Sequence, residues 1–143
     1  MAVRFFDQGV KARLDEKRRL ATYLQQLIRR QKPQAKKVDL TYVFCDDDYL
    51  LEINMDYLNH ATFTDIITFD LSETPEKLQG EVYISTERVA ENAAKYKVTY
   101  EKELHRVIFH GALHLCGFKD KKKADKERMR QEEDLCLQEY YNG

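Results

Sequence analysis

The sequence predicts a small α+β domain, with a mixed, mostly parallel sheet of about four strands and about five helices packed on it. Short segments typical of strands alternate with longer segments typical of helices along the chain. The chain has 143 residues, of which 43% are hydrophobic and 34% charged. This size and balance fit a single soluble globular domain, and we expect it to span residues 1–143.

Four segments are predicted to be strands, because they are rich in β-branched and aromatic residues. The first is expected at an edge of the sheet, and a loop through Ser72, Pro75 and Gly80 is expected between the last two. The segments are 3–6, 38–44, 66–69 and 81–84.

Five helices are predicted from apolar residues at helical spacing and from end signals. Pro33 closes the first helix, Ser85 or Thr86 can cap the third, and Thr99 can cap the fourth. The fourth helix ends near Gly117 and is expected to be central. The predicted ranges are 10–31, 46–59, 86–96, 100–116 and 123–140.

Composition excludes some classes of protein. The sequence has no apolar run of the roughly 20 residues that a transmembrane helix needs, and its start lacks the apolar region of a signal peptide. Cys45, Cys116 and Cys136 are odd in number and lack disulfide or metal-binding spacing. We therefore expect reduced thiols, a cytoplasmic location and no membrane partner.

Two clusters of basic residues offer weak support for a nucleic-acid partner. The net charge is −1, but residues 119–130 contain seven basic and three acidic side chains, and residues 29–37 form a second basic cluster. Such clusters can bind phosphate, although a charged run is more often a solvated helix face or loop.

The segment 110–120 carries the strongest chemical signal. His110 and His114 lie four residues apart, so on a helix they share one face and can bind one metal ion. Gly117 can end that helix in the left-handed conformation, and the following turn would return Asp120 toward the histidines. Two nitrogens, one oxygen and an open position are typical of catalytic zinc. Asp125 is an alternative third ligand.

The same segment argues against two other kinds of metal enzyme. The spacing of the histidines, Gly117 and Asp120 resembles that of metzincin peptidases. Those enzymes use a glutamate after the first histidine as general base, and this chain has Gly111 there. Two histidines and one carboxylate also occur in non-haem iron oxygenases, but too few strands are predicted for their barrel.

Several blocks together resemble the YbeY family of bacterial rRNA maturation factors, which are zinc-dependent endoribonucleases specific for single strands. The resemblance covers about half the chain and rests on Asn54, on Thr64-Asp65-Ile66-Ile67-Thr68-Phe69, on Gly80-Glu81-Val82-Tyr83-Ile84-Ser85 and on His110-Gly111-x-Leu113-His114-Leu115-x-Gly117-Phe118. The histidine block is fairly specific alone and highly specific together with the threonine-aspartate block.

The chain departs from the family pattern in three respects, the first of which involves two neighbouring residues. Asp120 stands where the family usually has a third histidine, preceded by Lys119 in place of an aspartate. Leu58 stands where the family has an arginine, and Glu81 replaces an aspartate. An aspartate ligand should acidify a bound water less than histidine would, and it could widen the metal choice toward manganese or iron.

The resemblance implies cleavage of single-stranded RNA, with roles in 3′-end maturation of 16S rRNA and in ribosome quality control. It also implies contact with the small ribosomal subunit or its assembly factors. We expect one Zn²⁺ per chain, bound by His110, His114 and Asp120, with His114 as the candidate catalytic residue. Zinc lowers the pKa of a bound water toward about 7, or it polarises a phosphoryl oxygen. Either water or the RNA 2′-hydroxyl could be the nucleophile.

Two alternative functions remain open at this point. One is a ribosome-assembly factor in which zinc has no catalytic role, and the other is a metal-dependent hydrolase of a small phosphoester or a peptide. Among the remaining residues, His60 could carry protons into the cleft, and His105 is expected to be structural or exposed. Thr64 and Asp65 either position the site or cap a turn.

Overall fold

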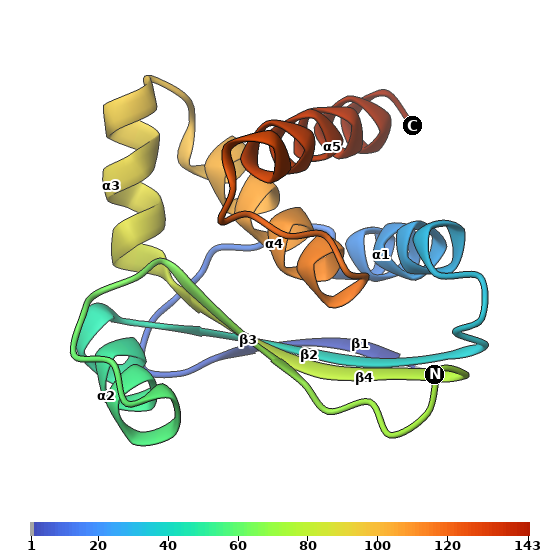
Figure 1. Cartoon of the computed structure of the whole chain (residues 1–143). Coiled ribbons are helices and arrows are strands. Elements are labelled where there is room, and N and C mark those ends of the chain that lie inside the picture. The colour runs from blue at the N-terminus through green and yellow to red at the C-terminus, as the bar shows by residue number, and fades with distance from the viewer. Residues whose placement is uncertain (1) are drawn as a thin grey trace.

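The computed structural model describes residues 2–143 and contains four strands and five helices in that range. Their order along the chain is the predicted one (Figure 1). The elements are β1 (Ala2–Asp7), α1 (Lys17–Gln31), β2 (Lys37–Cys45), α2 (Asp47–Leu58), β3 (Ile66–Asp70), β4 (Lys77–Ser85), α3 (Thr86–Tyr96), α4 (Tyr100–Leu115) and α5 (Lys123–Asn142).

The four strands form one mixed sheet in the order β1-β2-β4-β3. β1 pairs with β2 and β2 with β4 in parallel, whereas β3 runs antiparallel to β4. Both the α+β class and the mostly parallel sheet are therefore confirmed, as is the edge position of the first strand.

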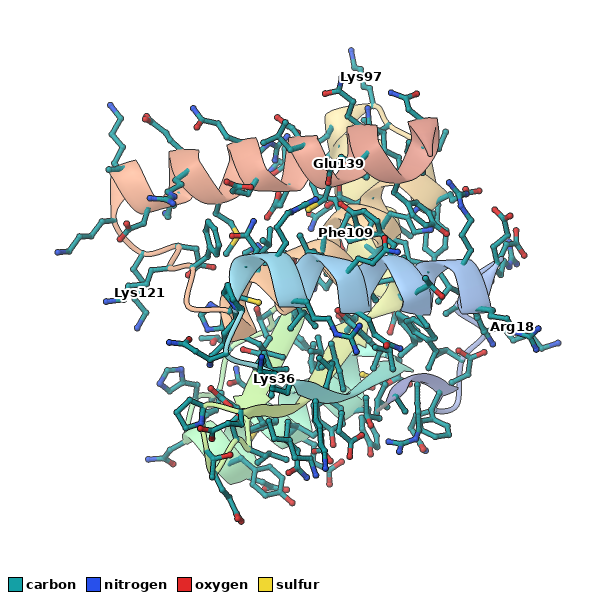
Figure 2. The ribbon with its side chains drawn as sticks, turned by 90° about the vertical axis from the view of Figure 1, so that its right-hand side faces the viewer. Arg18, Lys36, Lys97, Phe109, Lys121 and Glu139 are labelled. Atoms are coloured by element: carbon teal, nitrogen blue, oxygen red, sulfur yellow. The ribbon has the colours of Figure 1, made fainter. Side chains whose placement is uncertain are left out.

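α1, α4 and α5 lie on one face of the sheet, with α1 and α4 next to the strands and α5 outermost, whereas α2 packs against the other face (Figures 1 and 2). Alternate residues of β2, such as Leu40 and Tyr42, are fully buried beneath this layer. Phe109 of α4 joins the helices, because its ring lies 5.3 Å from that of Tyr23 in α1 and 5.9 Å from that of Tyr140 in α5. The predicted central position of α4 is thus confirmed.

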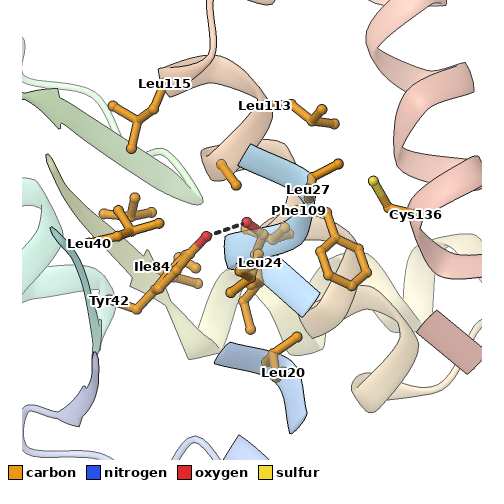
Figure 3. Packing of buried hydrophobic residues seen from close by; sticks show 14 of the residues in the cluster. Leu20, Leu24, Leu27, Leu40, Tyr42, Ile84, Phe109, Leu113, Leu115 and Cys136 are labelled. Carbon is orange, nitrogen blue, oxygen red and sulfur yellow. Dashed lines mark hydrogen bonds between the residues drawn. The ribbon is translucent and has the colours of Figure 1, made fainter. Parts of the chain in front are cut away.

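A polar contact in the core fixes α4 against the sheet. The Tyr42 hydroxyl donates a 2.7 Å hydrogen bond to the carbonyl oxygen of Ile108, both of them buried (Figure 3). Close approach is also needed at Gly111, where an added Cβ would lie 2.9 Å from Val82 Cγ1 in β4. The chain next to the candidate ligands is therefore in direct contact with a rigid sheet.

The structure corrects two of the predicted boundaries. Residues 10–16 are not helical, because Arg13 and Glu16 adopt positive φ angles of 59° and 52°, so α1 begins only at Lys17. This segment still contributes to the core through Ala12, whose carbonyl accepts a hydrogen bond from the Tyr100 hydroxyl. Gly80 lies inside β4 and not in a loop. Glycine suits this position in the strand, because its missing Cβ leaves room for Leu115 of α4.

The three cysteines are free, with Cys45 and Cys136 buried and Cys116 half-buried. Burial raises the pKa of the Cys116 thiol to about 12, which fits an unreactive packing role. Across residues 2–143, no helix combines the length and apolar character that crossing a membrane requires.

Candidate metal centre

The two histidines lie on α4 as the spacing predicts. The rings of His110 and His114 are parallel, with an angle of 3° between their planes and 6.5 Å between their centroids. α4 begins at the Thr99 cap, whose hydroxyl accepts a hydrogen bond from the Lys102 amide, and its buried face packs on the sheet. The helix therefore holds both imidazoles on one side, one turn apart.

The turn after α4 takes the form expected from Gly117. Its φ angle is +106°, and the helix ends in a Schellman motif: the Phe118 amide donates to the Leu113 carbonyl, and the Gly117 amide to the His114 carbonyl. The chain reverses there, and Asp120 Oδ2 lies 3.2 Å from His110 Nε2. The turn was predicted to return Asp120 toward both histidines, and the structure shows this approach for His110.

His110 has a second carboxylate partner, which comes from α5. Its Nδ1 lies 2.6 Å from Glu133 Oε2, and the Glu133 side chain is only 7% exposed. Burial alone would lower the pKa of His110, but the hydrogen bond to Glu133 and the charges of Glu133, Asp120 and Asp65 raise it above its usual value. The electrostatics at this ring therefore favour a positive charge, whether from a proton or a cation.

The predicted ligands are only partly assembled. Within residues 2–143, no three histidine, cysteine, aspartate or glutamate side chains lie close enough together to hold a metal ion. The pair of His110 and Asp120 does fit a shared ion, since two ligands about 2.0–2.1 Å from a tetrahedral zinc lie about 3.3 Å apart. Asp125 instead lines a separate cavity with Gly117 and Arg128.

The two histidines line different cavities. One, of about 340 Å³, is lined by His110, Asp120 and Asp65 and by Lys126 of α5. The other, of about 430 Å³, is lined by His114 together with residues of the α2–β3 loop and the turn after α4, among them Leu58, His60 and Lys121. Each histidine thus faces a cavity that also contains a lysine.

The residues of the threonine-aspartate block and Asn54 lie around these cavities. The buried Asn54 amide donates a hydrogen bond to the Thr62 carbonyl, which fixes the α2–β3 loop next to His114. Asp65 lines the cavity of His110, and burial raises the pKa of its carboxyl while His110 opposes the rise. Thr64 lines the cavity of His114.

The basic cluster at residues 119–130 divides between the two cavities and the surface. Lys121 and Lys126 line one cavity each, whereas the Arg128 guanidinium lies 5.3 Å from the centre of the Phe118 ring. In the second basic cluster, residues 29–37, Arg30 pairs with Glu139 at 2.8 Å. Only part of the basic sequence is therefore available to a polyanion at the candidate site.

Glu133 is the residue of this centre that sequence reasoning missed. It lies 23 residues after His110 in a helix whose charged residues suggest a solvated surface, and no motif spacing connects the two. A weak sequence signal did exist, because Glu133 lies four residues after the apolar Met129 and so shares its face of the helix. In the structure both residues are buried on the side of α5 that packs on α4.

The position of Gly111 gives a structural reason for the absent peptidase glutamate. An added Cβ at residue 111 would meet Val82 at 2.9 Å and Ile66 at 3.2 Å, so position 111 faces the sheet. A glutamate there would place its stem in a packed core, which argues against the peptidase alternative.

The fold and this cluster define a class: a small α+β domain with a histidine and carboxylate centre on its central helix. A family model described as "Endoribonuclease YbeY" matches residues 5–141. The chain therefore belongs to the YbeY endoribonuclease family.

Individual relatives agree with the family model. The chain is 43% identical over 133 residues to the endoribonuclease YbeY of Cytophaga hutchinsonii, covering 93% of this chain and 92% of that one. It is 53% identical over 103 residues to that of Flavobacterium psychrophilum, covering 72% and 73%. A protein of Thermotoga maritima with a solution structure matches with a TM-score of 0.64 and 26% identity, over 98% of this chain and 89% of that one.

Proposed function

We propose that this chain, as one domain over residues 1–143, is a metal-dependent endoribonuclease that cuts single-stranded ribosomal RNA. Its role would be 3′-end maturation of 16S rRNA and ribosome quality control in the cytoplasm. Family membership supports the reaction class. The observation that carries the metal-dependent site is the 3.2 Å approach of Asp120 to His110, whose far nitrogen is held by Glu133.

The residues proposed to hold one Zn²⁺ are His110, His114 and Asp120, with other divalent metals as alternatives. Their donors, two imidazole nitrogens and one carboxylate oxygen, suit zinc and leave a position for water or substrate. When bound, the ion would supply Lewis acidity and a water with a lowered pKa. Aspartate in place of the usual histidine adds negative charge and should therefore reduce that acidity.

The side chains around the proposed ligands would bind and orient the RNA. A phosphodiester near His114, the candidate catalytic residue, would meet the Lys121 ammonium in the same cavity, and Lys126 is available in the other. These cations would stabilise negative charge as it develops on the phosphoryl oxygens. His60 also lines the cavity of His114 and is the candidate proton carrier.

The partners proposed for this enzyme are ribosomal RNA and the small ribosomal subunit or its assembly factors. Leu58 lines the cavity at the position of the family's arginine, so no guanidinium from this position can reach a substrate phosphate. Lys121, in the same cavity, is the residue to which we assign that electrostatic role.

The test is cleavage of a labelled RNA that spans the 3′ end of 16S rRNA. We expect the zinc-loaded protein to cut single-stranded positions, His114→Ala and Asp120→Ala to lose this activity, and the matched control Asp125→Ala to keep it. Equal cutting by wild type and His114→Ala would overturn the assignment. A duplex of the same sequence should resist cleavage.

One rival function has an observation in its favour. Asp120 and Leu58 replace two residues typical of the family, so a metal centre without catalysis would suit a ribosome-assembly factor. That rival predicts zinc bound at one per chain and metal-dependent binding to the small subunit, with no RNA cleavage by the wild type.

A further inference from the structure

His110 is held at both of its ring nitrogens, and the two partners differ in exposure. The Glu133 side chain, 2.6 Å from Nδ1, is 7% exposed, whereas the Asp120 side chain, 3.2 Å from Nε2, is 37% exposed. The buried partner belongs to a neighbouring helix, and the exposed one to the turn that would complete the metal centre. One side of the ring is therefore fixed and the other is available to a ligand.

Glu133 is itself held in place by a second contact. Its other oxygen, Oε1, accepts a 3.1 Å hydrogen bond from Arg106 Nη1, and Arg106 Nη2 donates a 2.7 Å hydrogen bond to Asp134. Arg106 lies one turn before His110 on α4, and its side chain is only 12% exposed. Both carboxylate oxygens of Glu133 are thus used, and their positions relative to α4 are set by charge-assisted bonds.

A carboxylate that accepts from Nδ1–H selects one form of the neutral imidazole. With the proton on Nδ1, the lone pair lies on Nε2, the nitrogen that faces Asp120. In many zinc proteins, an outer carboxylate of this kind fixes the tautomer and orientation of a ligating histidine, and its loss costs 10–100-fold in metal affinity.

We propose that Glu133 is a positioning residue of the metal centre: it holds the His110 ring with Nε2 directed at Asp120 and fixes the Nδ1–H tautomer. This inference rests on the metal binding given above as the proposed function. It assigns to α5 a part in the site, although α5 contributes none of the proposed ligands. Arg106 acts one step further out, by holding Glu133.

Two variants of Glu133 and one of Asp134 distinguish positioning of the His110 ring from a purely structural contact between α4 and α5. Glu133→Ala removes the acceptor, and Glu133→Gln is nearly isosteric and keeps an oxygen acceptor without the charge. The matched control, Asp134→Ala, removes the other partner of Arg106 one residue along α5 and does not remove the acceptor of His110.

The first readout is zinc affinity, measured by competition with a chromophoric chelator. We expect Glu133→Ala to bind zinc about 10–100-fold more weakly than wild type, Glu133→Gln to be intermediate, and Asp134→Ala to stay within about twofold. If Glu133→Ala fails to fold, Glu133→Gln decides in its place. A Glu133 variant that folds and binds zinc as tightly as wild type would overturn the proposal.

The second readout needs no metal and reports the tautomer directly. Long-range ¹H–¹⁵N spectra of the metal-free protein, recorded above the pH at which the ring loses its proton, should show the Nδ1–H form of His110 in wild type and Asp134→Ala. Glu133→Ala should shift it toward the Nε2–H form. An unchanged tautomer would contradict the inference. If wild type binds no zinc, the proposed function fails, whereas the tautomer still decides the role of Glu133.

Discussion

His105 gives a prediction whose size follows from its surroundings. The residue is 3% exposed between α1, α4 and α5, and its Nδ1 lies 2.7 Å from the Tyr141 hydroxyl. Burial, with a further contribution from Arg19, lowers the pKa of His105 to about 4; Glu16 and Asp15 act in the opposite direction. The native state thus holds a neutral imidazole that the unfolded chain would protonate near pH 6.5.

The sign of the effect follows from proton binding. Between pH 6.5 and 4 the unfolded state binds more protons at this residue than the native state, so stability falls as pH falls and the loss levels off below pH 4. With these two pKa values the loss at pH 5 would be about 2 kcal/mol. Because Glu16 and Asp15 can relax toward an imidazolium, we expect about 1–2 kcal/mol.

The assay is urea unfolding of wild type and His105→Phe at pH 7.5 and pH 5. The difference in unfolding free energy between the two proteins should change by about 1–2 kcal/mol in favour of His105→Phe on acidification. Tyr141→Phe loses the same hydrogen bond but keeps the buried imidazole, so it should retain most of the pH dependence of wild type, because burial is the main cause of the lowered pKa. A difference for His105→Phe that stays constant within about 0.5 kcal/mol would refute the reasoning.

Three further predictions concern the packing and the ligands. Gly111→Ala should lower the free energy of unfolding by about 1–2 kcal/mol, because overpacking against Val82 outweighs the better helix propensity of alanine. Thermal or urea unfolding measures this change, and a stabilised variant would contradict the prediction. Tyr42→Phe should cost about 1 kcal/mol in urea unfolding through loss of the hydrogen bond to Ile108, and no change would show that the bond contributes nothing. Asp120→His should bind zinc more tightly than wild type in chelator competition, since it restores the family's ligand, and weaker binding would show that the turn is built for a carboxylate.

The sequence predicted most elements because local signals agree with the tertiary structure. Thr99 and Ser85 cap helices where expected, and Gly117 ends α4 with a positive φ. The prediction for residues 10–16 was wrong because the apolar residues there point into the core from an irregular segment. Apolar spacing reports burial, and burial does not require a helix.

The candidate site also combines contacts within one short segment with contacts between segments that are far apart in the sequence. His110, His114 and Asp120 lie within one helix end and its turn, so spacing alone predicts that they approach one another, and the structure shows this for His110 and Asp120. The contact with Glu133 depends on how α5 packs on α4, and the exclusion of a glutamate at Gly111 depends on the distance from α4 to β4. Such long-range contacts leave no periodic pattern in a single sequence.

The most direct test of the account is a crystal structure of the zinc-loaded protein with anomalous scattering recorded at the zinc edge. The account predicts one strong peak per chain, about 2.0–2.2 Å from His110 Nε2, from a nitrogen of His114 and from a carboxylate oxygen of Asp120. A peak bound by Asp125 in place of Asp120, or no peak at the end of α4, would contradict it.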